Sequence, residues 1–393
     1  MSNRVQFSLF FCNYNCLRSS LYLLIVCLSA CTSPEIQEKP VGPEYIFQAG
    51  AEGYACFRIP AIVSTLEGSL LAFAEGRKRG CSDTGDIDLV MKRSEDNGIT
   101  WSALSVIWDD GENTSGNPAP VVDKTTGTIL LLSTWNLGSD REPQIISLES
   151  EDTRRVFVLS SSDNGETWTV PEEITENVKL PEWTWYATGP GSGIQLTKGP
   201  HAGRLMIACD HIEAVTDHYY SHVIYSDDHG KTWQLGGSTP QHFVNESEVA
   251  ELEDGSLLLN MRNYAQDERH RKISHSYDGG DTWSDLQSDT TLIEPICQAS
   301  LQRYQFSDEG QSILLFSNPA SKTKREHMTL RASFDDGKTW PKKLLIHAGM
   351  AAYSDLVRLP GNYIGIFYEA GPDQDHGYQG IAFERIALSE LAE

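Results

Sequence analysis

Positive charge is scarce in this 393-residue chain, which has 31 Lys and Arg against 55 Asp and Glu and a formal net charge of −24. The sequence contains no basic block, so it lacks the positive patch with which proteins hold nucleic-acid phosphates. We therefore expect no nucleic-acid partner. An anionic ligand would instead need a local cluster of arginines.

Long apolar runs are also missing. The run at residues 21–30 has about ten residues, which is too short to span a bilayer. It follows a leader that contains Arg4 and Arg18 but no acidic residue, which is the pattern of a signal peptide. We therefore expect residues 1–30 to direct export and to be removed.

The apolar run stops at Leu28-Ser29-Ala30-Cys31, which resembles the bacterial lipobox, in which the cysteine becomes the lipid-bearing N-terminus. Ordinary cleavage after Ala30 is the alternative. The polar, proline-containing stretch that follows is typical of a flexible linker, so we expect residues 31–44 to form a tether. The protein is then exported to the bacterial cell envelope, on its periplasmic or outer side, and contacts the membrane only through a lipid anchor.

Cysteine is sparse, with eight residues, three of which lie in the leader. Neither a CxxC pair nor a His/Cys spacing typical of zinc occurs among the others, so we expect no metal and no other cofactor. Export permits a disulfide, and Cys56 with Cys81 is the pair to test.

The sequence does contain an internal repeat, with the pattern Ser-x-Asp-x-Gly-x-Thr-Trp. Its copies begin 67, 65, 50 and 57 residues apart, a spacing typical of solenoid or propeller repeats. The pattern predicts a turn, because Asp accepts backbone N–H groups, Gly permits a positive φ, and Trp packs where the next strand begins. The copies start at Ser94, Ser161, Ser226, Ser276 and Ser333.

Strand patterns recur between these turns, while long helical periodicity is absent. One strand is expected at each of residues 69–74, 128–133, 203–208, 256–260, 312–317 and 362–368. These strands and turns predict an all-β fold, a six-bladed β-propeller with four strands in each blade. We expect one propeller domain over residues 45–393 and no second domain.

The repeats resemble the Asp boxes of sialidases, which mark turns in the fold and do not by themselves specify chemistry. Other segments extend the likeness in the order in which bacterial sialidases have them. They are Phe57-Arg58-Ile59-Pro60, Glu75-Gly76-Arg77 with Ser82-Asp83, Asn245-Glu246 with Asn260-Met261-Arg262, Ser317-Asn318-Pro319 leading to Arg325, and Ala352-Tyr353-Ser354-Asp355. The chain is therefore identified as a member of the bacterial exo-α-sialidase family, and the resemblance implies the sialidase fold.

The resemblance implies that Arg58, Arg262 and Arg325 bind the carboxylate that sialic acid carries on its anomeric carbon. Guanidinium groups suit this role because their forked donors match a carboxylate. In a chain of net charge −24 they also supply the local positive potential that an anion needs. Arg77 is a fourth candidate, which either contacts a ring substituent or holds a carboxylate in place.

Three residues are implied to be catalytic. Tyr353 is the nucleophile, because an Asp or Glu would be repelled by the substrate carboxylate, and sialidases are known to use Tyr. Glu246 accepts the proton of Tyr353, whereas Glu248 and Glu251 are interpreted as strand-edge charges. Asp83 is the general acid/base, which protonates the leaving oxygen and then deprotonates the incoming water.

Other residues keep open interpretations. Trp135 and the aromatic residues of the segment 182–186 either line parts of the site by stacking or pack within the fold. Glu369, at the end of a predicted strand, has no assigned role.

The chain is expected to be an exo-α-sialidase, which hydrolyses terminal α-linked sialic acids of glycoproteins, glycolipids and oligosaccharides with retention, through a covalent sialyl-tyrosine. An enzyme that transfers sialic acid, between molecules or within one, would use the same site and remains an alternative. A non-catalytic Asp-box propeller that binds glycans is an alternative of another class, but it is expected to have lost at least one of the motif residues. We expect a monomer whose partners are sialylated glycoconjugates.

Overall fold

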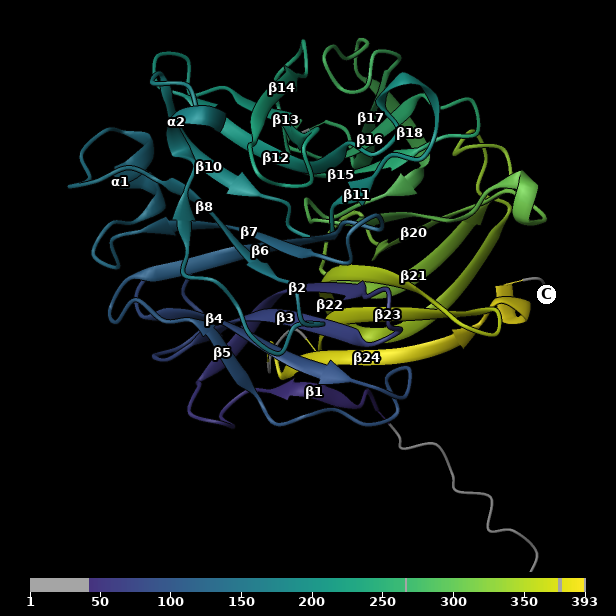
Figure 1. Cartoon of the computed structure of the whole chain (residues 1–393), viewed down its shortest axis with the longest axis horizontal. Coiled ribbons are helices and arrows are strands. Elements are labelled where there is room, and N and C mark those ends of the chain that lie inside the picture. Colours follow the sequence, from purple (N-terminus) through teal and green to yellow (C-terminus); the bar gives the residue numbers. More distant parts are fainter. Residues whose placement is uncertain (1–41, 266, 374–376, 392–393) are drawn as a thin grey trace, which may run out of the picture. The chain divides into compact units, whose positions relative to one another are not determined.

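The computed structural model describes residues 42–265, 267–373 and 377–391, and β-strands dominate them (Figure 1). The helical elements in these ranges are short: α1 (Glu142–Ile146), α2 (Thr175–Val178) and the 3-10 turns η1 (Gly199–His201), η2 (Ser307–Glu309) and η3 (Leu388–Leu391). No helix in the described ranges is long and apolar enough to cross a membrane.

The strands form six blades in which neighbouring strands pair antiparallel. Blade 1 contains β2 (Cys56–Ser64), β3 (Leu70–Arg77), β4 (Ile87–Ser94) and β5 (Ser105–Trp108), and blade 2 contains β6 (Thr114–Val122), β7 (Ile129–Asn136), β8 (Arg155–Ser161) and β9 (Glu172–Glu173). Blade 3 contains β10 (Trp183–Thr188) with β11 (Ile194–Gln195), β12 (Leu205–Glu213), β13 (Tyr219–Ser226) and β14 (Gln234–Ser238). Blade 4 contains β15 (Val244–Glu251), β16 (Leu257–Asn263), β17 (His270–Ser276) and β18 (Gln287–Ile293).

The last two blades share a strand. Blade 5 contains β19 (Ser300–Gln305), β20 (Ile313–Pro319), β21 (Glu326–Ser333) and the first part of β22 (Lys342–Leu359). Blade 6 contains the second part of β22, then β23 (Tyr363–Gly371), β24 (Gly380–Ala387) and β1 (Tyr45–Gln48). The strand predicted in each interval is the second strand of its blade, and in blade 6 this strand is β23, which follows the shared β22.

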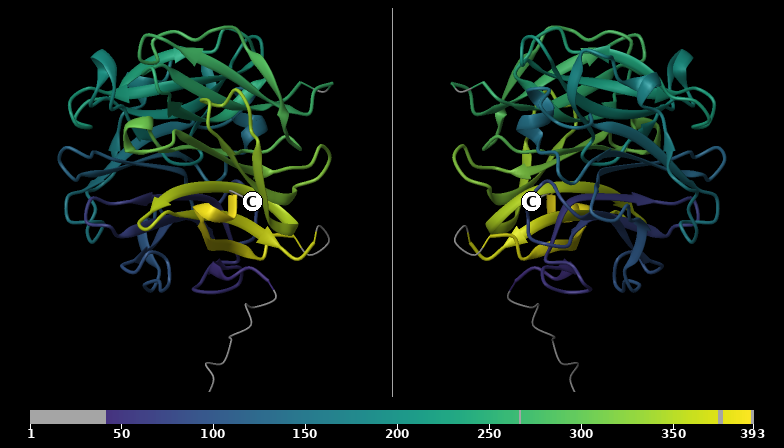
Figure 2. Two further views of the ribbon diagram at one scale, coloured as in Figure 1. Left: turned by 90° about the vertical axis from the view of Figure 1, so that its right-hand side faces the viewer. Right: turned by 90° about the vertical axis from the view of Figure 1, so that its left-hand side faces the viewer.

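Strand β1 completes the last blade. It pairs with β24, with Tyr45 opposite Ala382, so a strand from the N-terminal side of the domain joins strands from the C-terminal end. The two side views show this purple strand beside the yellow ones (Figure 2). The fourth strand of blade 6 is β1, which comes from the other end of the domain, so no turn joins it to β24. Blade 6 therefore has no Asp box, and the six blades have five boxes.

Apolar clusters fill the contacts between neighbouring blades. One large buried cluster lies between each pair of neighbours, and the cluster between blades 6 and 1 includes Phe47, Phe57, Phe367 and Phe383. The ring is therefore closed by side-chain packing as well as by β1. The predicted six-bladed propeller is confirmed.

The Asp boxes form the turns between the third and fourth strands of blades 1–5. In the second box, Ser161 Oγ accepts from Gly165 N at 2.9 Å, and Asp163 Oδ1 accepts from Thr167 N at 2.9 Å. Gly165 has a φ of 81°, and a Cβ at this position would lie 2.6 Å from a methyl carbon of Leu71 in blade 1. The box therefore fixes its own turn and also packs against the preceding blade.

Candidate active site

The residues predicted for the site line one cavity of about 170 Å³. They come from four blades: Arg58, Arg77 and Asp83 from blade 1, Glu246 and Arg262 from blade 4, Arg325 from blade 5, and Tyr353 from blade 6. Closure of the ring brings these distant positions together.

The inner strands are irregular where they meet the cavity. The register of β2 shifts between Arg58 and Ala61, and β15 and β22 shift near Glu246 and Tyr353. Within the β2 shift, Ile59 has a φ of 60°, which a β-branched residue rarely adopts. A β-bulge changes the direction in which nearby side chains point. The shifts therefore explain why Arg58, Glu246 and Tyr353 line the cavity, although the rest of their strands pack against neighbouring blades.

Tyr353 is buried, and its hydroxyl donates a hydrogen bond to Glu246 Oε1. Arg262 Nη1 contacts both residues, at 2.6 Å from Glu246 Oε2 and 3.1 Å from the Tyr353 oxygen. Burial and the charge of Glu246 raise the pKa of Tyr353 well above its ordinary value, although Arg262 and Arg325 oppose this. The phenol is therefore neutral, with a carboxylate placed to accept its proton.

The three predicted carboxylate-binding arginines surround Tyr353. The guanidinium carbons of Arg58 and Arg325 lie 5.2 and 5.5 Å from the centre of its ring, and Arg262 contacts its hydroxyl. Arg58 is buried, and its Nε donates to Glu369 Oε1 at 2.6 Å. This grouping places three guanidinium groups around Tyr353 and suits that side of the cavity to an anionic ligand.

Asp83 lies at the rim of the cavity, in the loop between β3 and β4. Its side chain is 67% exposed, and its Oδ1 is 2.7 Å from Arg77 Nη1 and 4.0 Å from Arg58 Nη1. Burial alone would raise the pKa of Asp83, but the charges of Arg77 and Arg58 outweigh it and lower the pKa below its ordinary value. Asp83 is therefore ionised when no ligand neutralises the arginines.

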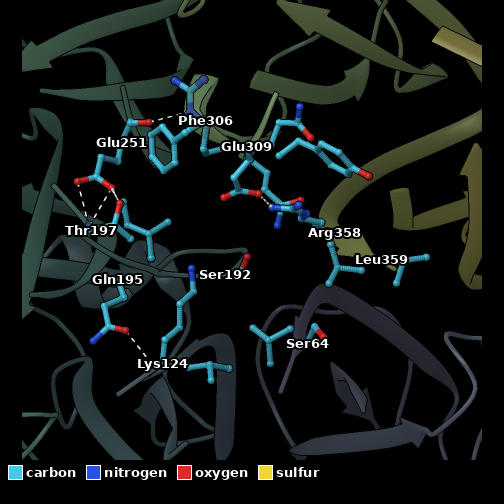
Figure 3. Close-up of a pocket in the computed structure, with 18 of the residues that line it drawn as sticks. Ser64, Lys124, Ser192, Gln195, Thr197, Glu251, Phe306, Glu309, Arg358 and Leu359 are labelled. Carbon is cyan, nitrogen blue, oxygen red and sulfur yellow. Dashed lines mark hydrogen bonds and ion pairs between the residues drawn. The ribbon is translucent and has the colours of Figure 1, made fainter. Parts of the chain in front are cut away.

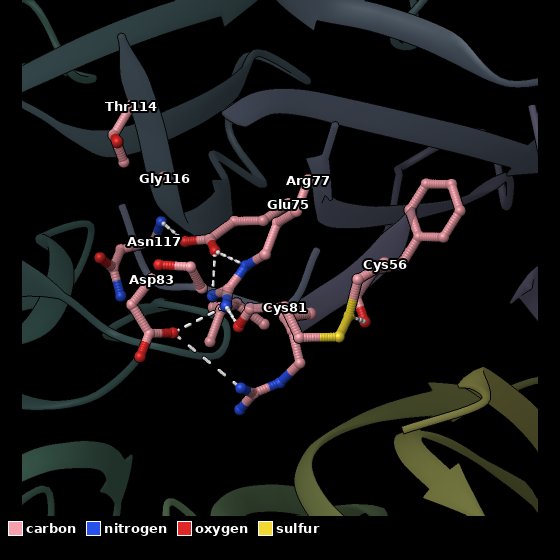
Figure 4. Close-up of polar contacts among 12 residues, drawn as sticks. Cys56, Glu75, Arg77, Cys81, Asp83, Thr114, Gly116 and Asn117 are labelled. Carbon is pink, nitrogen blue, oxygen red and sulfur yellow. Dashed lines mark hydrogen bonds and ion pairs between the residues drawn. A yellow bond between two sulfur atoms is a disulfide. The ribbon is translucent and has the colours of Figure 1, made fainter. Parts of the chain in front are cut away.

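A disulfide anchors the Asp83 loop (Figure 4). It joins Cys56, at the start of β2, to Cys81 in the loop, with Cα atoms 5.3 Å apart. Arg77 Nη1 also donates to the carbonyl oxygen of Cys81 at 2.7 Å, and Glu75 Oε2 holds Arg77 Nε at 3.0 Å. The structure thus contains the cysteine pair that the sequence singled out.

Glu369 is a functional residue to which the sequence assigned no role. Its carboxylate is fully buried and accepts from Arg58 Nε, from Ile59 N at 2.9 Å and from Tyr353 N at 3.3 Å. It therefore fixes both the arginine and the backbone of the tyrosine. The one signal in the sequence is an acidic residue that ends an otherwise apolar stretch of strand.

The interpretation of Glu248 and Glu251 as strand-edge charges is wrong, because both side chains are buried. Glu248 Oε2 accepts from Leu301 N at 2.7 Å, and Glu251 Oε1 accepts from Thr197 N at 3.0 Å. Each lies on an inner strand, where side chains meet a neighbouring blade and not solvent.

The aromatic candidates separate into two groups. Trp185 lines the cavity, and its ring lies 4.2 Å from the guanidinium carbon of Arg154. Trp183 is buried and stacks on His211, and Trp135 donates to Asp110 outside the residues that line the cavity. Among the described residues, no group of His, Cys, Asp and Glu is arranged to hold a metal ion.

A larger cavity, of about 770 Å³, lies at the other end of the same inner strands (Figure 3). It is lined by the last residues of β2, β6, β15 and β22, whereas the smaller cavity is lined by residues nearer their starts. Ion pairs already engage charged groups there, Lys198 with Glu253 and Arg358 with Glu309. None of the predicted site residues lines it, so we assign the chemistry to the smaller cavity.

The fold and the site define an Asp-box β-propeller with an anion-binding cavity built around a buried tyrosine and its carboxylate partner. A family model described as a BNR repeat-like domain matches residues 68–366. The chain is 36% identical over 339 residues to a sialidase of Micromonospora viridifaciens, a match that covers 82% of this chain and 51% of that protein. The chain thus spans about half the length of that relative.

Two further matches cover more of the relative. An exo-alpha-sialidase of Aspergillus fumigatus is 32% identical over 373 residues, which cover 86% of this chain and 85% of that protein. The solved structure of the Hadza microbial sialidase Hz136 matches with a TM-score of 0.80 and 32% identity, over 89% of this chain and 69% of that one. The chain belongs to the sialidase family of glycoside hydrolases.

Proposed function

We propose that this chain is an exo-α-sialidase that hydrolyses terminal α-linked sialic acids of glycoconjugates and retains the anomeric configuration. The observation that carries the proposal is the contact of the Tyr353 hydroxyl with Glu246 among three arginines. A neutral nucleophile suits a reacting carbon that bears a carboxylate, because a carboxylate nucleophile would be repelled. The arginines bind the substrate carboxylate and hold the anomeric carbon near the phenol oxygen.

In the first step, the oxygen of Tyr353 forms a bond to the anomeric carbon while the glycosidic C–O bond breaks. The phenol proton passes to Glu246, which already accepts a hydrogen bond from it. Asp83 gives a proton to the departing oxygen. The product of this step is a covalent sialyl-tyrosine.

In the second step, Asp83 removes a proton from a water molecule whose oxygen attacks the anomeric carbon. The bond to Tyr353 breaks, and the phenolate recovers its proton from Glu246. Two inversions at one carbon retain the α configuration.

Substrate binding prepares Asp83 for its first role. In the free protein the charges of Arg77 and Arg58 lower the pKa of Asp83, which favours the ionised form. A bound carboxylate partly neutralises Arg58, so the pKa of Asp83 rises and protonation of the acid becomes easier at the start of the reaction.

The test is proton NMR of the reaction on a synthetic α-sialoside, with protein that lacks residues 1–31 and with a chelator present. We expect the α anomer of free sialic acid to appear first. The β anomer as first product would contradict retention, and an anhydro sugar or a transfer product would favour transfer over hydrolysis. Loss of activity that zinc or magnesium restores would contradict a metal-free mechanism.

We also propose that the protein is a lipoprotein of the bacterial cell envelope, held by acyl chains on Cys31. This residue lies outside the described part of the chain, and the support is the lipobox-like sequence before it. Several acyl chains anchor stably, whereas one binds marginally. In a host that processes lipoproteins, wild type should fractionate with membranes and Cys31→Ala should not. Equal partition of two cleaved forms would favour an ordinary signal peptide.

A further inference from the structure

One side of the catalytic cavity is lined by polar and charged groups that the proposed mechanism does not use. These groups are Asn117, Glu142 and Arg154 of blade 2 and Asp210 of blade 3, and we call them the polar wall. Blades 2 and 3 lie across the ring from blades 5 and 6, which supply Arg325 and Tyr353. The wall therefore faces the nucleophile across the cavity.

Asp210 is the most unusual member of the polar wall. It lies on β12, is 1% exposed, and neither of its carboxyl oxygens has a hydrogen-bond partner among the described residues. An unpaired buried carboxyl group is costly, so such a group at a binding cavity points to a partner that the ligand supplies. Burial and the charges of Glu246 and Glu142 raise the pKa of Asp210 well above its ordinary value, which favours a neutral carboxyl that both donates and accepts.

Arg154 offers donors beside it. Its guanidinium is buried and donates to Asn136, to Asn117 and, at 3.1 Å from Nε, to the carbonyl oxygen of Tyr186. All three acceptors are neutral, and no ion pair with a carboxylate is formed in the described structure. Arginine has five N–H groups, so two remain for a ligand.

The position of the wall corresponds to one part of a sialic acid. The arginines and Tyr353 hold C2, which bears the carboxylate and is the reacting carbon. In the six-membered ring, the atom opposite C2 is C5. A ring that extends from the arginines across the cavity therefore brings its C5 substituent towards Asp210 and Arg154.

The chemistry of the wall suits a small hydroxyl better than an acyl group. A hydroxyl can donate to Asp210 and accept from Arg154 at once. An acetamido group adds a methyl. The four groups of the wall are polar or charged, and Trp185 and Ala187 of β10 are the apolar residues that line the cavity beside them. The whole cavity is about 170 Å³, below the roughly 300–1,000 Å³ common for ligand pockets, which also favours the smaller substituent.

We propose that Asp210 and Arg154 make this enzyme selective for sialic acids that carry a hydroxyl at C5 over those that carry an acetamido group. This inference rests on the proposed sialidase function. It assigns to the polar wall a role in substrate choice, apart from the bond-breaking steps.

The experiment compares kcat/KM for two 4-methylumbelliferyl α-sialosides that differ only at C5, one with a hydroxyl and one with an acetamido group. We expect wild type to favour the hydroxyl substrate by at least about tenfold. Asp210→Leu, which keeps the size but removes the polar atoms, should abolish that preference. Asp210→Asn, which keeps a neutral donor and acceptor, should retain most of it.

Glu213→Leu is the matched control, because Glu213 is an acidic residue on the same strand outside the cavity lining, and it should leave the ratio unchanged. Equal use of the two substrates by wild type, or preference for acetamido, overturns the inference while the sialidase proposal stands. An unchanged ratio in Asp210→Leu, with both rates reduced alike, overturns the role of Asp210. Hydrolysis of neither substrate overturns the proposed function and this inference with it.

Discussion

Residue by residue, the site depends on buried carboxylates that hold positive groups in place. Glu369 binds Arg58 from behind, and Glu75 binds Arg77 in the same way. A buried arginine without such a partner would be costly, and a mobile one would clamp a substrate carboxylate poorly. These two acids therefore act through the arginines and need no contact with the substrate.

Glu369→Gln tests this positioning role. The amide keeps the shape but removes the charge that faces Arg58, so the substrate carboxylate should be bound less well. We expect KM for an α-sialoside to rise about tenfold or more, corresponding to loss of part of a buried charge-assisted hydrogen bond, with a smaller effect on kcat. Steady-state kinetics measures both constants. Glu384→Gln on β24, where the carboxylate accepts from Tyr368, is the control, and a matching KM rise there would contradict the account.

At the scale of elements, loops and turns determine how the blades present the site. The loop between β3 and β4 carries Asp83 and is held by the Cys56–Cys81 disulfide. The Asp boxes lie at the turns between third and fourth strands and pack against the preceding blade. The loop positions a catalytic residue, whereas the Asp boxes stabilise the packing between neighbouring blades.

Removing the disulfide should reveal its effect on Asp83. In a Cys56→Ser, Cys81→Ser double variant, we expect the loop to hold the acid less well. Hydrolysis of a sialoside with a poor alkyl leaving group should fall by about tenfold or more, because that oxygen needs a proton, while an activated aryl sialoside should lose less. Parallel losses on both substrates, measured as kcat/KM, would mean that the disulfide serves stability alone.

Gly165→Ala tests the packing of an Asp box. The new methyl must adopt a φ of 81° and lie 2.6 Å from Leu71, so both backbone strain and a clash oppose it. Gly53→Ala is matched, because its φ is 88° and no atom lies within 4 Å of the added Cβ. We expect denaturant unfolding to show Gly165→Ala destabilised by about 1–3 kcal/mol more than Gly53→Ala. Equal losses would show that packing against blade 1 contributes little.

At the scale of the whole molecule, a buried carboxyl pair lies where the inner strands meet. Glu248 of β15 and Asp355 of β22 both accept from Ser300 Oγ, and Asp355 also accepts from Ile62 N of β2 at 2.8 Å. Burial raises the pKa of both groups above their ordinary values, and Asp355 further raises that of Glu248. The pair thus links blades 1, 4, 5 and 6. This arrangement requires the unfavourable burial of two carboxyl groups away from water.

The pair predicts how stability depends on pH. The pKa values of Glu248 and Asp355 are higher in the folded protein than in the unfolded chain. At pH values above about 4, the ordinary carboxyl pKa, the folded protein therefore binds more protons than the unfolded chain. The contribution of the pair to the free energy of unfolding should therefore decrease as pH rises from about 4.5 to 7.5. Glu248→Gln should make the decline shallower in denaturant titrations across this range, whereas Glu251→Gln on the same strand should not. Identical slopes in all three proteins would contradict the prediction.

The sequence predicts the ring better than it predicts the interior of the site. Each Asp box is a local signal, so five turns can be read from eight-residue patterns, and the six recurring strand patterns add the number of blades. The motif arginines, Tyr353 and Glu246 follow from resemblance. Arg58 and Glu369, in contrast, are 311 residues apart and meet only when blade 6 packs on blade 1. Asp210 likewise belongs to no motif. Such contacts depend on ring closure, which strand periodicity does not specify.

Trapping the covalent intermediate decides whether Tyr353 forms a bond to the sugar. A 3-fluorinated sialosyl fluoride should react with the protein lacking residues 1–31 and slow the second step. Intact mass spectrometry should then show one added fluorosialyl unit, and peptide mapping should place it on Tyr353, with no addition to Tyr353→Phe. A label on Glu246 or on any other residue, or normal turnover of natural sialosides by Tyr353→Phe, would contradict the account.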